Sequence, residues 1–365
     1  MNCKVSEVSC VIFKTIHTNT CIHTNTGIHT NPGGIHSIRR TLADNFGPVS
    51  DVDGDGTVSF LFADLGSTPG GFPVGYFDPT DVYYPKDTFA GCNDPNRHGS
   101  NGADMLYLLD PGQFNAHNPS KYTFDVIADE EMPGTMAHEL QHNVNFNVRW
   151  LAAGAKHVSE ATWLNEGLSM VSEDLAGFGL HTATERARVA WYLKYYQAWS
   201  LTAWESNVTN AANGLYGGVH AFLRWLLDQA GPAGSAALTK ALEASPLTGP
   251  DNVAVATGKP FATQLATFAH AALLSGESFA PFPALGFASG TDWSPLHTTV
   301  GYASYYGLPW LSQPTFTADL RANGWGLYLT GVGSGADATV TVTSTAAVKP
   351  YVVVTRFVGS LPLPP

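Results

Sequence analysis

The spacing of hydrophobic residues predicts a helix that begins near residue 135. Four apolar residues recur there at every fourth position: Met136, Leu140, Val144 and Val148. Residues four apart share one face of an α-helix, so this spacing gives a single apolar ridge that packs on a core. A second stretch, from about 163 to 178, has the same kind of spacing, carried by Leu164, Leu168, Val171 and Leu175. Two amphipathic helices are therefore expected in the middle of the chain.

Two further helices are predicted downstream, at 185–199 and 216–230. The dipeptide Gly231-Pro232 follows the second one and is expected to end it, because glycine and proline terminate helices. Between 232 and 310 the pattern leaves two alternatives open, a helical subdomain or a set of aromatic-rich loops.

Strand patterns lie on both sides of this helical part. Short runs rich in β-branched and aromatic residues predict strands at 57–63, 75–77 and 105–109. The pattern returns after residue 313, in Thr339-Val-Thr-Val-Thr and Tyr351-Val-Val-Val-Thr. The chain is thus predicted to be an α+β protein with a small β-rich C-terminal region, at 313–365.

The first 40 residues show neither the helical nor the strand pattern of hydrophobic residues. They contain the repeats Ile16-His-Thr-Asn-Thr, Ile22-His-Thr-Asn-Thr and Ile28-His-Thr-Asn-Pro, with too few apolar residues to form a core. We expect a low-complexity disordered tail over 1–40 and a catalytic domain over 41–312. The start lacks an apolar leader segment, so no signal peptide is predicted.

Composition excludes several classes of protein. Only 13% of the 365 residues are charged, and the formal net charge is -12, so no basic surface for a nucleic acid is expected. No run approaches the roughly 18 apolar residues of a membrane helix. Three of the 4 cysteines lie in the tail and only Cys92 in the body, which excludes a disulfide framework.

The strongest chemical signal is His138-Glu139-Leu-Gln-His142, which falls inside the first predicted helix. Histidines four apart lie on one helix face and can bind one metal ion, while the glutamate beside the first can reach its water. A catalytic zinc site has three protein ligands and one open position. The sequence therefore predicts zinc held by His138 and His142, with Glu139 as the general base.

The third ligand must come from another segment. Asn145 and Val148 stand where the longer metzincin pattern requires glycine and histidine, so that class is excluded. Glu166, on the next predicted helix in Trp163-Leu-Asn-Glu-Gly, is the favoured third ligand. Glu160 and His157 remain alternatives.

These segments resemble the hyicolysin-type neutral zinc metalloproteases, a secreted bacterial group of the gluzincin class. The resemblance is carried by His138-Glu-Leu-Gln-His142 and by Trp163-Leu-Asn-Glu-Gly-Leu-Ser-Met-Val-Ser-Glu-Asp174, with weaker support from Asp51-Val-Asp-Gly-Asp-Gly. It implies a zincin-like fold, with a twisted sheet, an active-site helix and a helical second lobe. It also implies a secreted zinc endopeptidase that acts on proteins or peptides, with Glu166 as a ligand.

The chain departs from this group in one respect. Thermolysin-like members often carry an aspartate four residues after the ligand glutamate, where this chain has Met170. Ser169, Glu173 or Asp174 is expected to orient a histidine in its place, because such partners fix the ring tautomer.

Two further roles are predicted. Tyr216 and His220, four apart on a predicted helix, are candidate donors to the oxyanion of the transition state. The alternating carboxylates from Asp51 to Asp55 resemble half of a calcium loop, which makes calcium a second candidate ion, although Phe62 stands at the closing glutamate's position.

Two rival functions remain open. One is a zinc hydrolase of non-protein substrates. The other is a non-catalytic secreted or adhesion protein with a structural zinc, which four protein ligands would close.

Overall fold

The computed structural model describes residues 11–12, 34–66, 72–84, 100–117, 127–180, 182–196, 199–204, 211–274, 322–324, 341–343 and 352. It divides the chain into two compact units, 1–159 with 169–182, and 160–168 with 183–365. Each unit is described by itself. Cys92, the histidine repeats and nearly all of the β-rich region predicted at 313–365 lie outside the described residues.

A four-stranded sheet forms the base of the first unit, in the order β1-β2-β4-β3. Its strands are β1 (Val11–Ile12), β2 (Ser59–Ala63), β3 (Gly75–Phe77) and β4 (Met105–Leu109). β2 and β4 run parallel, whereas β3 is antiparallel to β4 and pairs Gly75 with Leu108. The three strands predicted in this part are thus confirmed, and β3 is an edge strand of the described sheet.

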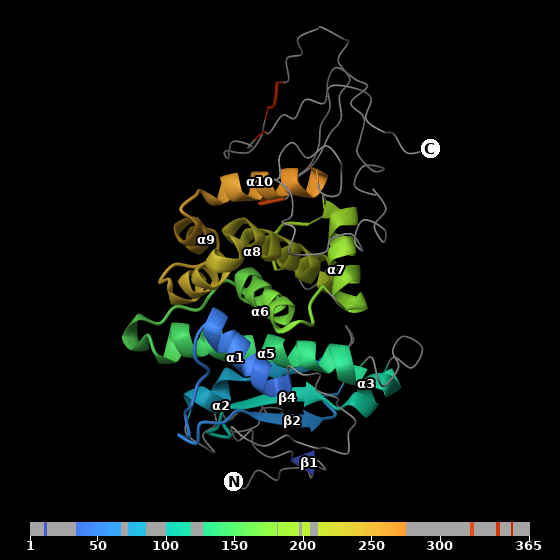
Figure 1. Ribbon diagram of the computed structural model, residues 1–365, viewed down its shortest axis with the longest axis vertical. Coiled ribbons are helices and arrows are strands. Elements are labelled where there is room, and N and C mark those ends of the chain that lie inside the picture. The colour runs from blue at the N-terminus through green and yellow to red at the C-terminus, as the bar shows by residue number, and fades with distance from the viewer. Residues whose placement is uncertain are drawn as a thin grey trace. The chain divides into compact units, whose positions relative to one another are not determined.

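Helix α5 (Met132–Phe146) covers this sheet and contacts β3 and β4 (Figure 1). Its apolar ridge is buried as predicted at Met136, Leu140 and Val144. The segments η1 (Ile127–Glu131) and η2 (Asn147–Leu151) extend it at both ends as π-helix, a form that often occurs at functional sites. α5 is therefore the central element of the first unit.

Helix α1 (Gly34–Asn45) also packs on α5 and buries Ile38 and Leu42. The predicted start of the folded body at Thr41 consequently falls inside a helix, and the last residues of the expected tail are helical. The few apolar residues of α1 stand among His, Thr and Gly residues and do not form a clear helical spacing, so the sequence did not predict this helix.

Polar contacts attach the loop before β2 to α5. Asn143 accepts a hydrogen bond from the Ser50 backbone N–H at 3.0 Å, and its amide donates to the Ser50 hydroxyl at 2.6 Å. That hydroxyl in turn donates to Asp104, whose burial raises the pKa of its carboxyl. Each buried polar group here has a partner, as interiors require.

A second buried network lies at the same end of the sheet, where β3 ends and β4 begins. The Tyr107 hydroxyl on β4 donates to Asp81 at 2.6 Å. Asp81 lies in the short helix α2 (Pro79–Tyr83) and is fully buried. Burial, together with this bond, raises the pKa of Tyr107, so the phenol stays protonated. The remaining short helix of this unit is α3 (Pro111–His117).

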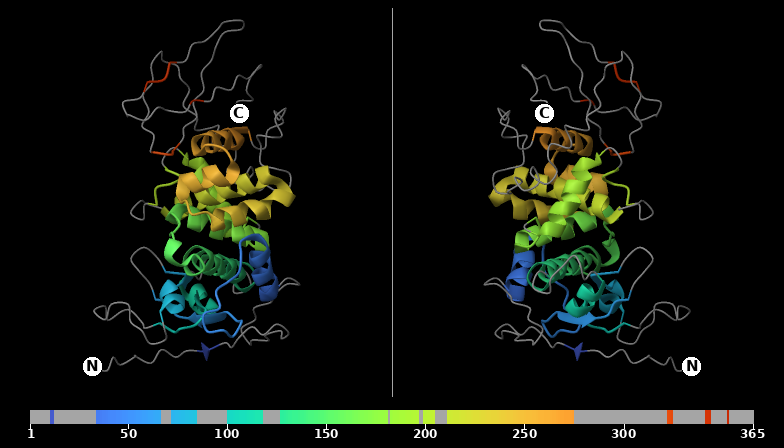
Figure 2. Two further views of the ribbon diagram at one scale, coloured as in Figure 1. Left: turned by 90° about the vertical axis from the view of Figure 1, so that its left-hand side faces the viewer. Right: turned by 90° about the vertical axis from the view of Figure 1, so that its right-hand side faces the viewer.

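Helix α6 (Thr162–Ala176) contributes to both units, and α7 (Ala183–Lys194), α8 (Ala211–Ala244), α9 (Gly249–Thr257) and α10 (Phe261–Leu274) belong to the second. Figure 2 shows α8 beside its neighbours, and it contacts α7, α9 and α10. Their shared core is aromatic, with Phe222 against Trp163, Trp225, Phe261 and Phe268. Of the two alternatives left open downstream of residue 232, the described part, to residue 274, is helical.

The helix ends at Gly231-Pro232 as predicted, and a second helix follows it within α8. Gly231 has φ 71° and ψ 170°, which breaks the helical backbone, and Pro232 then begins a further helical stretch to Ala244. Glycine adopts this left-handed φ at little cost, and proline suits the first turn of a helix. The chain therefore leaves helical geometry at Gly231 and resumes it at Pro232.

No helix in the described ranges combines the length and apolar character needed to cross a membrane.

Candidate metal centre

Two histidines and a glutamate lie together on α5 and α6. One ligand atom from each of His138, His142 and Glu166 lies within 4.8 Å of the others. The two imidazoles come from successive turns of α5, with ring centroids 4.9 Å apart and planes at 79°. Because side chains four apart share a helix face, the HELQH spacing alone places these rings side by side. The three residues can therefore bind one metal ion.

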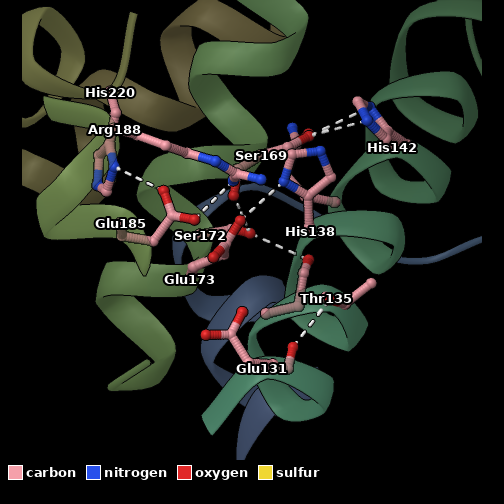
Figure 3. Close-up of polar contacts among 12 residues, drawn as sticks. Glu131, Thr135, His138, His142, Ser169, Ser172, Glu173, Glu185, Arg188 and His220 are labelled. Atoms are coloured by element: carbon pink, nitrogen blue, oxygen red, sulfur yellow. Dashed lines mark hydrogen bonds and ion pairs between the residues drawn. The ribbon is translucent and has the colours of Figure 1, made fainter. Parts of the chain in front are cut away.

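One face of α6 lies toward these histidines. Glu166, Ser169 and Glu173 are spaced by three and four residues, so they form one stripe along the helix. Figure 3 shows Ser169 and Glu173 reaching His142 and His138 from this stripe. The helix period thus delivers one candidate ligand and two partners for the imidazoles.

Glu173 orients His138. Its Oε1 lies 2.8 Å from His138 Nδ1, and both side chains are about nine-tenths buried, with 9% and 11% of their side-chain surface exposed. A carboxylate accepts the Nδ1–H, which leaves Nε2 as the lone-pair nitrogen for a metal. Of the three candidates predicted to orient a histidine, Glu173 is therefore the one that bonds His138.

Ser169 contacts His142. Its hydroxyl donates to Gln141 Oε1 at 2.6 Å and lies 3.1 Å from His142 Nδ1. The hydroxyl oxygen also lies 3.5 Å from His142 Nε2, so Ser169 contacts the edge of the ring that carries both nitrogens. Glu173 thus orients the ring of His138, and Ser169 contacts the ring of His142.

Asp174, the third candidate for this role, acts elsewhere. Its carboxylate accepts the Leu180 N–H at 2.6 Å and packs against Gly179, where an added Cβ would lie 1.9 Å from Oδ1. It closes the turn that follows α6, so two of the three candidates contact the histidines and the third is structural.

The alternative third ligands are also engaged elsewhere. Glu160 accepts hydrogen bonds from the Gly249 N–H and from the Asn252 amide, each at 2.6 Å, and so caps the N-terminus of α9. His157 is exposed, stacks on Trp150 at 3.8 Å and has Nδ1 2.8 Å from the Gly154 carbonyl. No local pattern indicates the Glu160 contacts, because the partners lie 89 and 92 residues away.

Glu139 follows His138 on α5 and stands three residues before His142, so it lies beside the face that carries the two imidazoles. It is 7% exposed, and its Cγ lies close to Gly75 of the edge strand β3. A glutamate in this position, adjacent in sequence to His138, can take a proton from water near the ligand atoms. Its role as general base stays a prediction.

Tyr216 and His220 lie on α8 in the second unit. His220 is completely buried with Nδ1 3.6 Å from Glu185 Oε2, while the Arg188 guanidinium bonds Glu185 at 2.6 Å and lies 5.2 Å from the centre of the Tyr216 ring. The structure brings these four residues of α7 and α8 together. The role of Tyr216 and His220 toward an oxyanion stays a prediction.

The predicted calcium segment forms part of a second carboxylate group. Asp51 and Asp53 have ligand atoms within 4.8 Å of Asp104, whereas Asp55 accepts hydrogen bonds from the Thr57 N–H and hydroxyl, at 2.7 and 2.6 Å. Asp104, at the start of β4, was not foreseen as a member. Calcium binding stays a prediction.

Comparison with known proteins supports a relationship to metalloproteases. The chain is 31% identical over 135 residues to the neutral metalloprotease ShpI of Staphylococcus hyicus, a match that covers 36% of this chain and 26% of that protein. The chain thus spans about a quarter of the relative's length. No protein-family model matches the chain.

Proposed function

We propose that the chain is a secreted zinc endopeptidase with a zincin-like fold of the gluzincin, hyicolysin-like type. The observation that carries the proposal is the convergence of two imidazoles and one carboxylate within 4.8 Å, beside a glutamate that follows the first histidine. The partial similarity to a neutral metalloprotease supports the same reading. The substrates proposed are proteins or peptides.

The donor set fits zinc. Two neutral imidazoles and one carboxylate match the ligands of catalytic zinc sites, which keep one position open. Glu173 holds Nδ1 of His138, which leaves its Nε2 available, and Ser169 contacts the ring of His142. The chemistry that zinc supplies when bound is a lowered pKa of its water, to about 7, and a polarised scissile carbonyl.

The residues of the chain have distinct roles in hydrolysis. Glu139 takes the proton of the attacking water and gives it to the departing amine, which general acid–base catalysis requires. Its burial next to β3 restricts the carboxylate to a small region beside the ligands. Tyr216 and His220 are the proposed hydrogen-bond donors to the developing oxyanion.

Replacing Glu139 tests the function. Glu139→Gln removes the base and keeps the side-chain size, so kcat on casein and on N-blocked peptides is expected to fall by about 10² to 10⁴-fold. Zinc content, measured by mass spectrometry of the metal, is expected to equal that of the wild type. Glu130→Gln on the partly exposed η1 is the matched control and keeps full activity.

Retained turnover in Glu139→Gln would refute the mechanism. Zinc binding by a wild type that cleaves neither substrate would favour the adhesion protein or the hydrolase of non-protein substrates.

A further inference from the structure

Strand β3 approaches α5 unusually closely at Gly75. A Cβ added to this residue would lie 2.7 Å from Thr135 Cγ2, 3.0 Å from Leu108 Cδ2 and 3.1 Å from Glu139 Cγ. Carbon atoms in contact normally lie 3.5 to 4.0 Å apart. The backbone of β3 therefore lies so close to the proposed base that residue 75 has no room for a side chain. Any residue other than glycine would have to displace its neighbours.

The strand is fixed on its own side of this contact. Gly75 and Phe77 pair with Leu108 and Leu106 of β4, and Tyr76 stacks on Tyr107 with ring centroids 4.6 Å apart. Alternate residues of a strand share a face, so Phe77 faces α5 as Gly75 does, and its ring lies 5.9 Å from that of Phe146. Moving β3 away from α5 would break these contacts.

Thr135 is fixed on the helix side. Its hydroxyl donates to the Glu131 carbonyl at 2.8 Å, which sets χ1 and with it the position of Cγ2. The Glu139 side chain has more rotatable bonds than Thr135. With Thr135 fixed, Glu139 and Leu108 are the side chains that must move to admit a methyl group at residue 75.

We propose that Gly75 is a positioning residue for Glu139: the missing side chain on β3 lets the base adopt the conformation from which it takes the proton of water. This inference rests on the function proposed above. It assigns Gly75 no contact with substrate or metal, and it predicts that the placement of the base depends on one glycine in a neighbouring strand.

The test compares Gly75→Ala with Glu139→Gln in the full chain. Displacing a catalytic group by about 1 Å can cost about 10²-fold in rate, so kcat of Gly75→Ala is expected to fall by about that factor with KM changed less than about twofold. Zinc content and the circular dichroism spectrum are expected to match the wild type. Gly234→Ala, whose Cβ would meet only Ala230 Cβ at 3.4 Å, is the matched control and keeps full activity.

A second variant supplies a rescue that loss of packing would not predict. Thr135→Ser removes Cγ2, the closest obstacle, and keeps the hydroxyl that bonds Glu131. In the Gly75→Ala/Thr135→Ser double variant, Glu139 can return and kcat is expected to recover by about tenfold. If Gly75→Ala does not fold, kcat and zinc content of the double variant decide instead: an intermediate kcat at full zinc content supports the proposal.

The inference is overturned by a kcat of Gly75→Ala within twofold of the wild type, or by a loss that only follows the loss of zinc or of folded protein. In both cases the proposed function stands as long as Glu139→Gln is inactive and zinc-loaded. If Glu139→Gln is as active as the wild type, the proposed function fails and the role of Gly75 fails with it.

Discussion

The protein contains two buried histidine–glutamate pairs that differ in their surroundings. His138 and Glu173 link α5 and α6 at 2.8 Å, and His220 and Glu185 link α8 and α7 at 3.6 Å (Figure 3). The first pair lies beside a second imidazole and a second carboxylate. The second pair lies beside Arg188, which bonds the same glutamate.

This difference shows what turns a polar pair into a candidate metal site. Glu173 uses one oxygen to fix His138 Nδ1, and His138 also belongs to the group formed with His142 and Glu166. Beside Glu185, the guanidinium of Arg188 already supplies the positive charge that the carboxylate needs. A buried histidine–glutamate pair is therefore not sufficient evidence for metal binding, and convergence of a third and fourth group is required.

The largest effect on zinc binding is expected from Glu166, the carboxylate that lies beside the His138–Glu173 pair and has no counterpart beside His220 and Glu185. Glu166→Ala removes the third ligand itself. Removing a residue that only orients a ligand typically lowers metal affinity by about 10 to 100-fold, so zinc affinity is expected to fall here by more than about 100-fold. Competition with a zinc indicator dye measures this. Glu160→Ala is the control; it leaves the Gly249 N–H and Asn252 without their carboxylate. It should keep zinc and lose about 1 to 3 kcal/mol of unfolding free energy.

Loss of zinc in Glu160→Ala but not in Glu166→Ala would reverse the assignment of the third ligand.

A smaller effect separates the two glutamates of the pairs. Glu173→Gln weakens the hold on His138 Nδ1, and zinc affinity is expected to fall by about 10 to 100-fold. The equivalent change Glu185→Gln should leave zinc affinity unchanged, because its imidazole is not one of the three candidate ligands, and should lower the temperature of unfolding. Equal effects of the two substitutions on zinc affinity would show that the distinction between the pairs is wrong.

The parts of the fold that sequence could predict are those with local signals. The four-residue spacing of Met136, Leu140 and Val144 predicted α5, and the adjacent HELQH pattern predicted two of the three candidate ligands. Glu166 followed from the need for a carboxylate on the next helix. These inferences need only the period of a helix and the chemistry of zinc.

The parts that sequence could not predict depend on contacts between distant segments. Three candidates for orienting the histidines were left open, because the choice among Ser169, Glu173 and Asp174 depends on how α6 is rotated about its axis. No local pattern predicts the cap that Glu160 forms on α9, and none predicts the close approach of α5 at Gly75. Helix α1 was missed because its few apolar residues follow a low-complexity repeat.

The central claim concerns the ligands of one metal ion, and X-ray absorption at the zinc edge of the purified protein tests it most directly. The account predicts two imidazole nitrogens at about 2.0 to 2.1 Å and oxygen ligands at about 2.0 to 2.2 Å, consistent with one carboxylate and one water. His142→Ala should lose one of the imidazoles. A zinc shell with sulfur at about 2.3 Å, or one with three or more imidazoles drawn from the N-terminal repeats, would contradict it.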